Sequence, residues 1–283
     1  MVECKTKYPI MLVHGIGYSD KDNPRYWGRI PMTLKDHGAE IHFSGQDSFG
    51  NIRSNAGQLY ENIKEIIEKS GAEKINMIAH SRGGIDARFV ISETDASDMV
   101  ASLTTIATPH KGISSIDIMK GKNSEALEML YRVFGTMLSV DGGERPEDNK
   151  VYDQLSADYM DIFNEFIKDD PDVYYQSYAF DMKNRASDPA MGLFHSIVLK
   201  NEGENDGFVS VDSAKWGDFR GIVSGMGMKG ISHPKAVDGR RNRFTPQGHR
   251  HSSYSDGGVT HFCYSDITDF YIDMVARLAE MGY

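Results

Sequence analysis

The stretch that decides the fold is "MIAHSRGG", residues 77–84, in which an apolar run ends at a serine and two glycines follow. The run suits a strand buried on both faces of a sheet, and "GIDARFVISE" after it has a helical apolar pattern. Ser81 therefore stands at a strand–turn–helix junction, which lifts a serine hydroxyl to the carboxyl end of a sheet. The residues two before and two after such a serine must be small, and Ala79 and Gly83 meet that demand.

The same junction also has a purely structural interpretation. A serine between a strand and a helix serves as an N-cap, and Gly83 and Gly84 would then allow tight packing of the helix. The usual nucleophile pattern begins with glycine, whereas this chain has Ala79. The motif alone leaves both interpretations open.

A second glycine turn favours the interpretation of Ser81 as a catalytic nucleophile. The segment "LVHGIG", residues 12–17, ends another buried apolar run, and its glycines let the backbone approach a neighbouring group closely. We expect the backbone amides of Ile16 and Arg82 to form an oxyanion hole beside the Ser81 hydroxyl. A plain glycine turn is the alternative.

Strands and helices alternate along the chain, which predicts an α/β fold with a mostly parallel sheet. Regularity breaks over residues 112–168, where two helical patterns flank a polar, glycine-rich stretch. We interpret that segment as a helical lid or cap inserted into a single domain, residues 1–283. The expected strands cover residues 8–15, 39–45, 73–80, 100–109, 172–180 and 219–225, and the last of these is expected to be the final strand. Helices are expected near 55–70, after residue 82 and at 265–282. Residues 239–260 are expected to form a loop.

Composition excludes several classes of protein. With 283 residues and 40% hydrophobic content, the chain can bury one large core. A net charge of -10 argues against a nucleic-acid partner, which requires a basic face. Cys4 and Cys263 are too few for a disulfide framework. No apolar run is long enough for a transmembrane segment, and the first residues lack a signal-peptide layout, so secreted and cytoplasmic locations both stay open.

Four segments together resemble the bacterial family I triacylglycerol lipases, which have the α/β-hydrolase fold. They are "YPIMLVHGIG", "KINMIAHSRGGIDARFV", "ASLTTIATPHKG" and "NDGFVSVDSAKWG". The resemblance covers most of the chain outside residues 112–168. It implies a serine hydrolase that cleaves carboxylic esters through an acyl-enzyme on Ser81 and needs no cofactor.

The resemblance also indicates the acid of a catalytic triad, since the order along this fold is serine, acid, histidine. The turn "NDG" presents Asp206 as the family presents its acid. An ordinary turn with a solvated carboxylate is the alternative. Glu202 and Glu204 are the next candidates.

Four histidines follow Asp206, and their positions discriminate among them. His233 falls in the loop after the strand expected at 219–225, where the family has its catalytic histidine. His261, beside the last helix, is the second candidate. His249 and His251 lie in a polar loop without a recognisable zinc spacing, and we expect them to be solvated.

Many lipases of this family hold Ca²⁺ near the catalytic histidine, which raises the question of a metal site. Asp188 aligns with one ligand, but Lys235 and Gly239 stand at the other two ligand positions. Lysine offers only hydrogen-bond donors and cannot ligate calcium. We therefore expect no metal and hypothesise that the Lys235 ammonium replaces the cation opposite Asp188.

The resemblance favours a lipase whose lid at residues 112–168 opens at a lipid–water interface. A permanently packed cap would instead make the protein a carboxylesterase for shorter, soluble esters. An acyltransferase would use the same triad and exclude water. A binding protein on this scaffold would lack a triad member, and all three members have candidates here.

Overall fold

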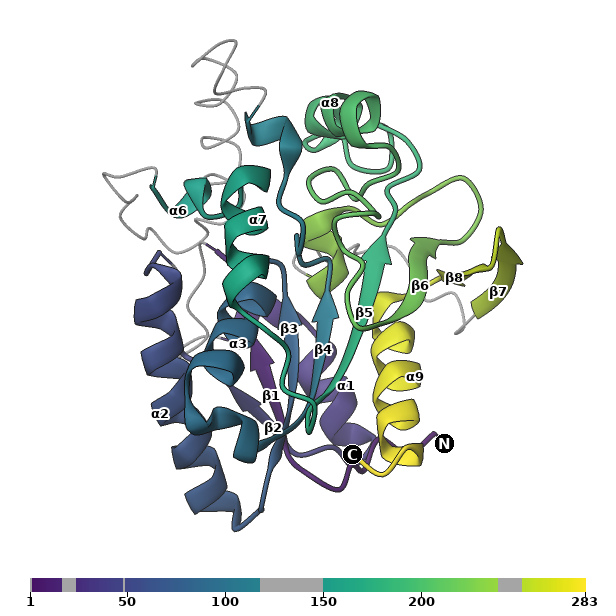
Figure 1. Ribbon diagram of the computed structural model, residues 1–283. Coiled ribbons are helices and arrows are strands. Elements are labelled where there is room, and N and C mark those ends of the chain that lie inside the picture. Colours follow the sequence, from purple (N-terminus) through teal and green to yellow (C-terminus); the bar gives the residue numbers. More distant parts are fainter. Residues whose placement is uncertain (1, 17–23, 48, 118–149, 239–250) are drawn as a thin grey trace.

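An eight-stranded sheet forms the centre of the computed structural model, which describes residues 2–16, 24–47, 49–117, 150–238 and 251–283 (Figure 1). The strand order is β2-β1-β3-β4-β5-β6-β8-β7, and every neighbouring pair is parallel except β7 and β8. The mostly parallel α/β architecture expected from the sequence is confirmed. The strands are β1 (Ile10–Val13), β2 (Ile41–Phe43), β3 (Ile75–His80), β4 (Val100–Ile106), β5 (Tyr174–Phe180), β6 (Asp218–Gly225), β7 (His251–Asp256) and β8 (Val259–Tyr264).

Helices cover both faces of the sheet because strand side chains alternate between the faces. Ile10 and Leu12 of β1 pack in one buried cluster with α1 and α9, whereas Met11 and Val13 pack in another with α2 and α3 (Figure 1). The helices are α1 (Ile30–Asp36), α2 (Ile52–Ser70), α3 (Arg82–Glu93), α6 (Lys150–Asp153), α7 (Ala157–Phe166), α8 (Gly192–Glu202) and α9 (Ile267–Glu280), with 3-10 turns η1 (Pro24–Trp27), η2 (Asp95–Asp98) and η3 (His233–Val237).

A third apolar cluster is formed by residues of α6, α7 and α8 together with residues in and after the carboxyl ends of the strands. Ile16 after β1, Ile113 after β4 and Phe208 before β6 all belong to it. The cluster therefore joins segments that are far apart in the sequence at the edge where parallel α/β sheets hold their ligand sites.

Helix α2 begins three residues before the predicted start, and a cap explains the difference. The Asn51 side chain accepts a hydrogen bond from the Ser54 amide at 2.9 Å, which satisfies one of the free amides of the first turn. The helix ends at Gly71, whose φ of 70° suits the left-handed conformation of a C-cap.

The prediction that residues 219–225 form the final strand is wrong. β7 and β8 follow and form an antiparallel hairpin, and β8 pairs in parallel with β6. The six side chains of β7 are all exposed, so this strand lacks the apolar alternation on which the prediction depended. Of the loop expected at 239–260, residues 239–250 lie outside the described part, while Gly257 and Gly258 form the hairpin turn with φ of 54° and 82°.

The insertion expected at 112–168 is described only in part, since residues 118–149 lie outside the described ranges. Its second helical pattern is confirmed as α6 and α7. The Ser156 side chain caps α7, and Met160 and Phe163 of that helix are buried in the third cluster. α7 thus packs on the third cluster through its buried face.

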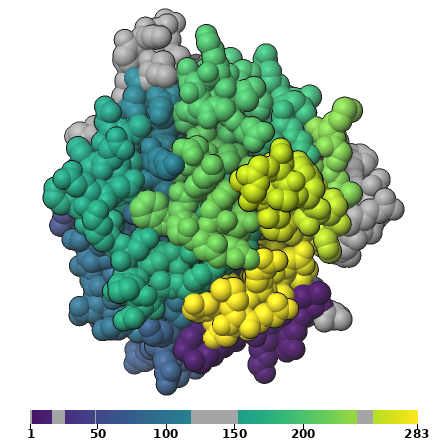
Figure 2. Space-filling model, turned by 45° about the vertical axis from the view of Figure 1, so that its right-hand side comes forward, coloured from purple at the N-terminus to yellow at the C-terminus, as the bar shows by residue number. Residues whose placement is uncertain are grey.

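The first and last described residues lie together at the amino end of the sheet. The Lys7 amide donates to the Tyr283 carbonyl at 2.7 Å, and Figure 2 shows the C-terminal helix beside the N-terminal segment. Cys4 and Cys263 are both free and buried. Across the described ranges, no helix combines the length and apolarity needed to cross a bilayer.

Candidate active site

Ser81 occupies the sharp turn between β3 and α3. Its φ of 57° and ψ of -133° are rare for a residue with a side chain, and such strain persists only where the surroundings impose it. The Ser81 amide donates to the Ile106 carbonyl at 2.9 Å, and the Thr108 hydroxyl donates to the Ser81 carbonyl at 2.8 Å. The Ser81 side chain makes no capping hydrogen bond to α3, so the N-cap interpretation is wrong.

The glycine turn after β1 packs directly against this junction. A Cβ atom at Gly83 would lie 2.4 Å from the His14 carbonyl oxygen, and one at Gly15 would lie 3.0 Å from the Ser81 Cβ. Only glycine permits both approaches. The Ile16 amide follows this turn and the Arg82 amide opens α3, and neither donates a backbone hydrogen bond within the described residues.

The structure brings Ser81, Asp206 and His233 together, as the sequence predicts. His233 Nε2 lies 2.9 Å from Ser81 Oγ, and His233 Nδ1 lies 2.6 Å from Asp206 Oδ2. All three residues are buried. One tautomer satisfies both contacts: the Nδ1–H group donates to the carboxylate, and Nε2 accepts from the serine hydroxyl.

Asp206 is held rigidly and is not a solvated turn residue. Its Oδ1 accepts hydrogen bonds from the Phe208 amide at 2.9 Å and the Val209 amide at 2.8 Å, which leaves Oδ2 for the imidazole. The Asp206 carbonyl also accepts from the His233 amide at 2.8 Å. Gly207 permits the turn with a φ of 98°. Backbone and side chain therefore fix the carboxylate and the histidine relative to each other.

The other candidates lie elsewhere. Glu202 accepts two hydrogen bonds of 2.7 Å from Ser115, and the ring of His261 stacks on Tyr254 at 4.7 Å in the β7–β8 hairpin. His251 is exposed at the start of β7. His249 falls outside the described ranges. The Glu204 carbonyl accepts a hydrogen bond from the Val211 amide.

Tyr26 is a neighbour of the site that the sequence did not reveal. Its hydroxyl accepts from the Gly15 amide at 2.9 Å and lies 2.5 Å from His80 Nδ1. The His80 ring in turn lies 4.6 Å from the His233 ring, centroid to centroid. Burial, followed by the electrostatic interaction with the His233 ring, lowers the pKa of His80 well below its usual value, which favours the neutral form of His80. No local sequence pattern connects Tyr26 with these partners.

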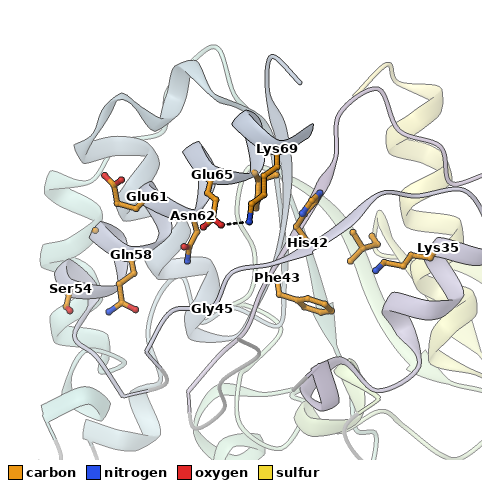
Figure 3. Close-up of a pocket in the computed structure, with 13 residues that line it drawn as sticks. Lys35, His42, Phe43, Gly45, Ser54, Gln58, Glu61, Asn62, Glu65 and Lys69 are labelled. Carbon is orange, nitrogen blue, oxygen red and sulfur yellow. Dashed lines mark hydrogen bonds and ion pairs between the residues drawn. The ribbon is translucent and has the colours of Figure 1, made fainter. Parts of the chain in front are cut away.

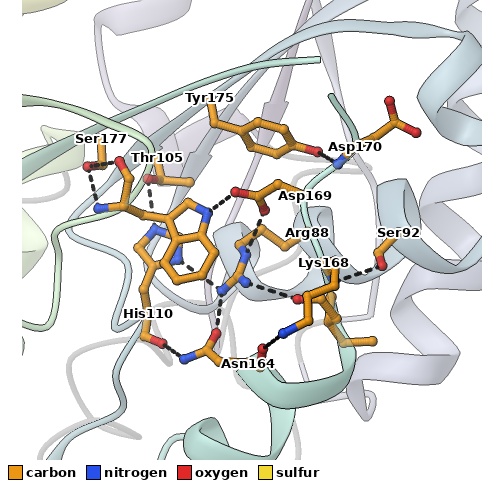
Figure 4. Close-up of polar contacts among 12 residues, drawn as sticks. Arg88, Ser92, Thr105, His110, Asn164, Lys168, Asp169, Asp170, Tyr175 and Ser177 are labelled. Carbon is orange, nitrogen blue, oxygen red and sulfur yellow. Dashed lines mark hydrogen bonds and ion pairs between the residues drawn. The ribbon is translucent and has the colours of Figure 1, made fainter. Parts of the chain in front are cut away.

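A second buried network is centred on Arg88 of α3 (Figure 4). The Arg88 side chain is fully buried. Its Nη1 donates to Asn164 Oδ1 at 2.9 Å and to His110 Nδ1 at 3.4 Å. Its guanidinium carbon lies 3.6 Å from the centre of a Trp216 ring, a cation–π contact. Burial lowers the pKa of Arg88 to about 10, partly offset by Asp169, so it stays charged at neutral pH.

His110 connects this network to the segment after β4. Its Nε2 lies 3.0 Å from Thr105 Oγ1, and its carbonyl accepts from Asn164 Nδ2 at 2.8 Å. Burial and the Arg88 charge lower the pKa of His110 well below its usual value. Through Asn164 of α7, Arg88 and His110 thus join α3 and the segment after β4 to that helix.

The residues considered for calcium form a hydrogen-bonded cluster. Asp188 accepts from the Ser232 hydroxyl at 2.7 Å, and Lys235 Nζ donates to the Ser187 carbonyl at 2.6 Å. Within the described ranges, no group of three His, Cys, Asp or Glu side chains is arranged to hold a metal. The Lys235 ammonium thus contacts the backbone of the residue next to Asp188, and its replacement of a calcium ion stays a prediction.

Among the described residues, one groove lies away from the triad and one small cavity lies nearer to it. An open groove of about 820 Å³ runs along the edge strand β2 between α1 and α2, away from the three residues (Figure 3). A far smaller apolar cavity of about 10 Å³ is lined by Ile113, Phe194, Phe208 and their neighbours. The Phe208 ring meets the His233 ring edge-on at 5.4 Å, so one residue that lines this cavity also contacts the imidazole.

Comparisons with known sequences agree with this geometry. Residues 9–180, more than half of the chain, match the family described as palmitoyl protein thioesterase. A triacylglycerol lipase from Pseudarthrobacter phenanthrenivorans is 35% identical over 47% of this chain and 46% of its own length. Triacylglycerol lipase 2 of Saccharomyces cerevisiae is 26% identical over 91% of this chain and 74% of its own length. The chain thus spans less than half of the bacterial relative.

Solved structures share the architecture. Mature Bacillus licheniformis lipase BlEst2 has a TM-score of 0.64 and 20% identity, with 83% of this chain and 88% of that chain covered. EstA from Clostridium botulinum has a TM-score of 0.63 and 18% identity, with 99% and 88% covered. These likenesses establish the α/β-hydrolase fold.

Proposed function

The chain belongs to the palmitoyl protein thioesterase family, and from this premise we propose that it is a serine hydrolase that cleaves carboxylic esters. Its substrates are acylglycerols, met at a lipid–water interface, and it acts as a lipase of the bacterial family I type. The hydrogen bonds from Ser81 to His233 and from His233 to Asp206 carry this proposal. The triacylglycerol lipases among its relatives support the substrate class.

The reaction follows from the roles of the three side chains. Ser81 Oγ attacks the ester carbonyl while its proton passes to His233 Nε2. Asp206 holds the tautomer with Nδ1 protonated and stabilises the imidazolium. His233 then gives the proton to the leaving alcohol, and an acyl-enzyme remains. Water, deprotonated by the same imidazole, releases the acid and restores Ser81.

The negative oxygen formed at each step needs donors. We assign this role to the Ile16 and Arg82 amides, because Ile16 follows the glycine turn after β1, Arg82 follows Ser81, and these two segments pack against each other. Each well-placed donor contributes about 10²–10³ in rate in enzymes of this kind. The start of α3 adds a partial positive charge.

Other acyl substrates would use the same chemistry. The family's description favours thioesters, and a carboxylesterase would act on shorter, soluble esters. An acyltransferase would replace water with an alcohol. The identity of the acyl donor and acceptor separates these candidates.

A fluorophosphonate probe tests the nucleophile, since only an activated serine is labelled. We expect labelling of the unaltered protein and of Ser70→Ala, a control on the surface of α2, and none of Ser81→Ala. Hydrolysis of p-nitrophenyl esters of increasing chain length, with and without an emulsion, then ranks lipase against esterase, and palmitoyl-coenzyme A tests thioesters. Equal labelling of Ser81→Ala would refute the proposal.

A further inference from the structure

The residue that follows the nucleophile carries a buried cation that the proposed chemistry does not use. The Arg82 side chain is 1% exposed, and arginine is rarely buried so completely without a partner. Burying it costs free energy that an apolar side chain of similar size would not. A role for the guanidinium beside the Ser81 turn would account for its presence.

Its contacts connect three separate segments. Arg82 Nη2 donates to the Gly50 carbonyl in the loop before α2, and lies 3.5 Å from Gln154 Oε1 between α6 and α7. Gln154 also accepts from the Ile52 amide at 3.3 Å, which joins that segment to α2. The side chain therefore ties the first turn of α3 to both neighbouring elements.

One carboxylate faces the Arg82 guanidinium. Asp86, one turn later on α3, lies 3.5 Å from Nη2 and accepts from Asn55 Nδ2 at 2.8 Å. The ion pair is loose, and Nε and Nη1 of Arg82 have no hydrogen-bond partner among the described residues. An arrangement selected for stability alone would pair them, so the tether to Gly50 and Gln154 is the better explanation.

We propose that the Arg82 guanidinium is a positioning group for the oxyanion site, because it anchors the peptide whose amide stabilises the oxyanion. This inference rests on the proposed function. Rotation of the Arg82 peptide would move the amide, and the side chain resists that rotation by its contacts with the Gly50 carbonyl and Gln154. Since the Gly50 carbonyl and Gln154 are uncharged acceptors, the proposed effect is geometric.

Two substitutions separate geometry from charge. Arg82→Lys keeps the charge but loses the planar fork, and Arg82→Met loses both. If the guanidinium acts through position, both variants lower kcat by about tenfold, part of the 10²–10³ that one donor supplies. KM for a p-nitrophenyl ester stays within about twofold, since the change affects the transition state more than the bound ester.

A trifluoromethyl ketone, which forms a tetrahedral adduct with the serine, provides a readout that a merely structural role would not move. Its inhibition constant is expected to rise in parallel with the fall in kcat/KM, at unchanged urea midpoint for the folded variants. Gln154→Ala removes one tether without altering Arg82, and is expected to lower kcat by about threefold. Arg53→Met, on the exposed face of α2, is the control.

The outcomes are distinct. Arg82→Lys and Arg82→Met that fold and keep kcat and the inhibition constant within about twofold of the unaltered protein overturn the inference. A normal Arg82→Lys with a tenfold weaker Arg82→Met also overturns it, in favour of charge. If neither Arg82 variant folds, Gln154→Ala decides, and an unchanged kcat and inhibition constant in that variant overturn the inference. An unaltered protein that is not labelled at Ser81 refutes the proposed function instead.

Discussion

Replacing Arg88 with methionine should destabilise the fold far more than an ordinary surface change. The substitution keeps an unbranched, apolar stem but removes the guanidinium from a fully buried position. Asn164 Oδ1 and His110 Nδ1 then lose a donor, and Asp169, 3.6 Å from Arg88 Nε, loses its cation. The cation–π contact with Trp216 is lost as well.

The size of the effect follows from these losses. Breaking a buried charged network by removing one partner costs about 3–5 kcal/mol, because the remaining groups stay desolvated. Asp169 keeps part of its stabilisation, since it still accepts from Trp216 Nε1 at 2.7 Å and is 31% exposed. We therefore expect a loss of about 3 kcal/mol in the free energy of unfolding, or roughly 6–12 °C in Tm.

Urea unfolding followed by circular dichroism measures the change, with a fluorophosphonate labelling rate recorded on the folded variant. Arg53→Met provides the control, because Arg53 is exposed on α2 and lies 5.7 Å from the Phe89 ring. The control should lose less than about 0.5 kcal/mol. An Arg88→Met variant that loses less than about 1 kcal/mol would show that the network contributes little, and would refute the reasoning.

Three further predictions concern packing, pH and metal. Gly83→Ala should prevent folding, because its Cβ would clash with the His14 carbonyl oxygen. Gly57→Ala on α2 meets no neighbouring atom and should stabilise the fold by up to about 1 kcal/mol. Thermal melts of both variants test this, and equal melting temperatures would contradict the packing described. The pKa of His110 is lowered by burial, so the unfolded state binds the extra proton and stability falls as pH drops below about 6.5. Urea titrations should show a smaller fall in His110→Gln, and an unchanged fall would count against the assignment. Treatment with a chelator should leave ester hydrolysis within about twofold, since Lys235 already donates at the place of a calcium ligand; a loss that calcium reverses would refute the replacement.

The sequence predicted those parts of the fold that have local signals. Continuous apolar runs marked β1 and β3, because strands covered on both faces need them. The exposed β7 had no such run, and only the Gly257–Gly258 turn signalled the hairpin. Edge strands carry polar side chains that also suit a loop, so pattern alone does not separate the two.

The candidate site divides in the same way. Ser81, Asp206 and His233 were predictable because each belongs to a turn with its own residue pattern, and the contacts among them follow from the order of parallel strands. Tyr26 was not, since its contacts with Gly15 and His80 depend on packing across the sheet. Whether Ile16 and Arg82 stabilise an oxyanion stays a prediction.

The left-handed backbone of the nucleophile sets stability against activity. A residue with a side chain in that conformation costs about 1–3 kcal/mol, whereas glycine adopts it freely. Ser81→Gly should therefore melt at a higher temperature than the unaltered protein while losing all turnover. Random mutagenesis that selects for thermal stability alone would therefore recover substitutions of Ser81 that raise the melting temperature and abolish activity.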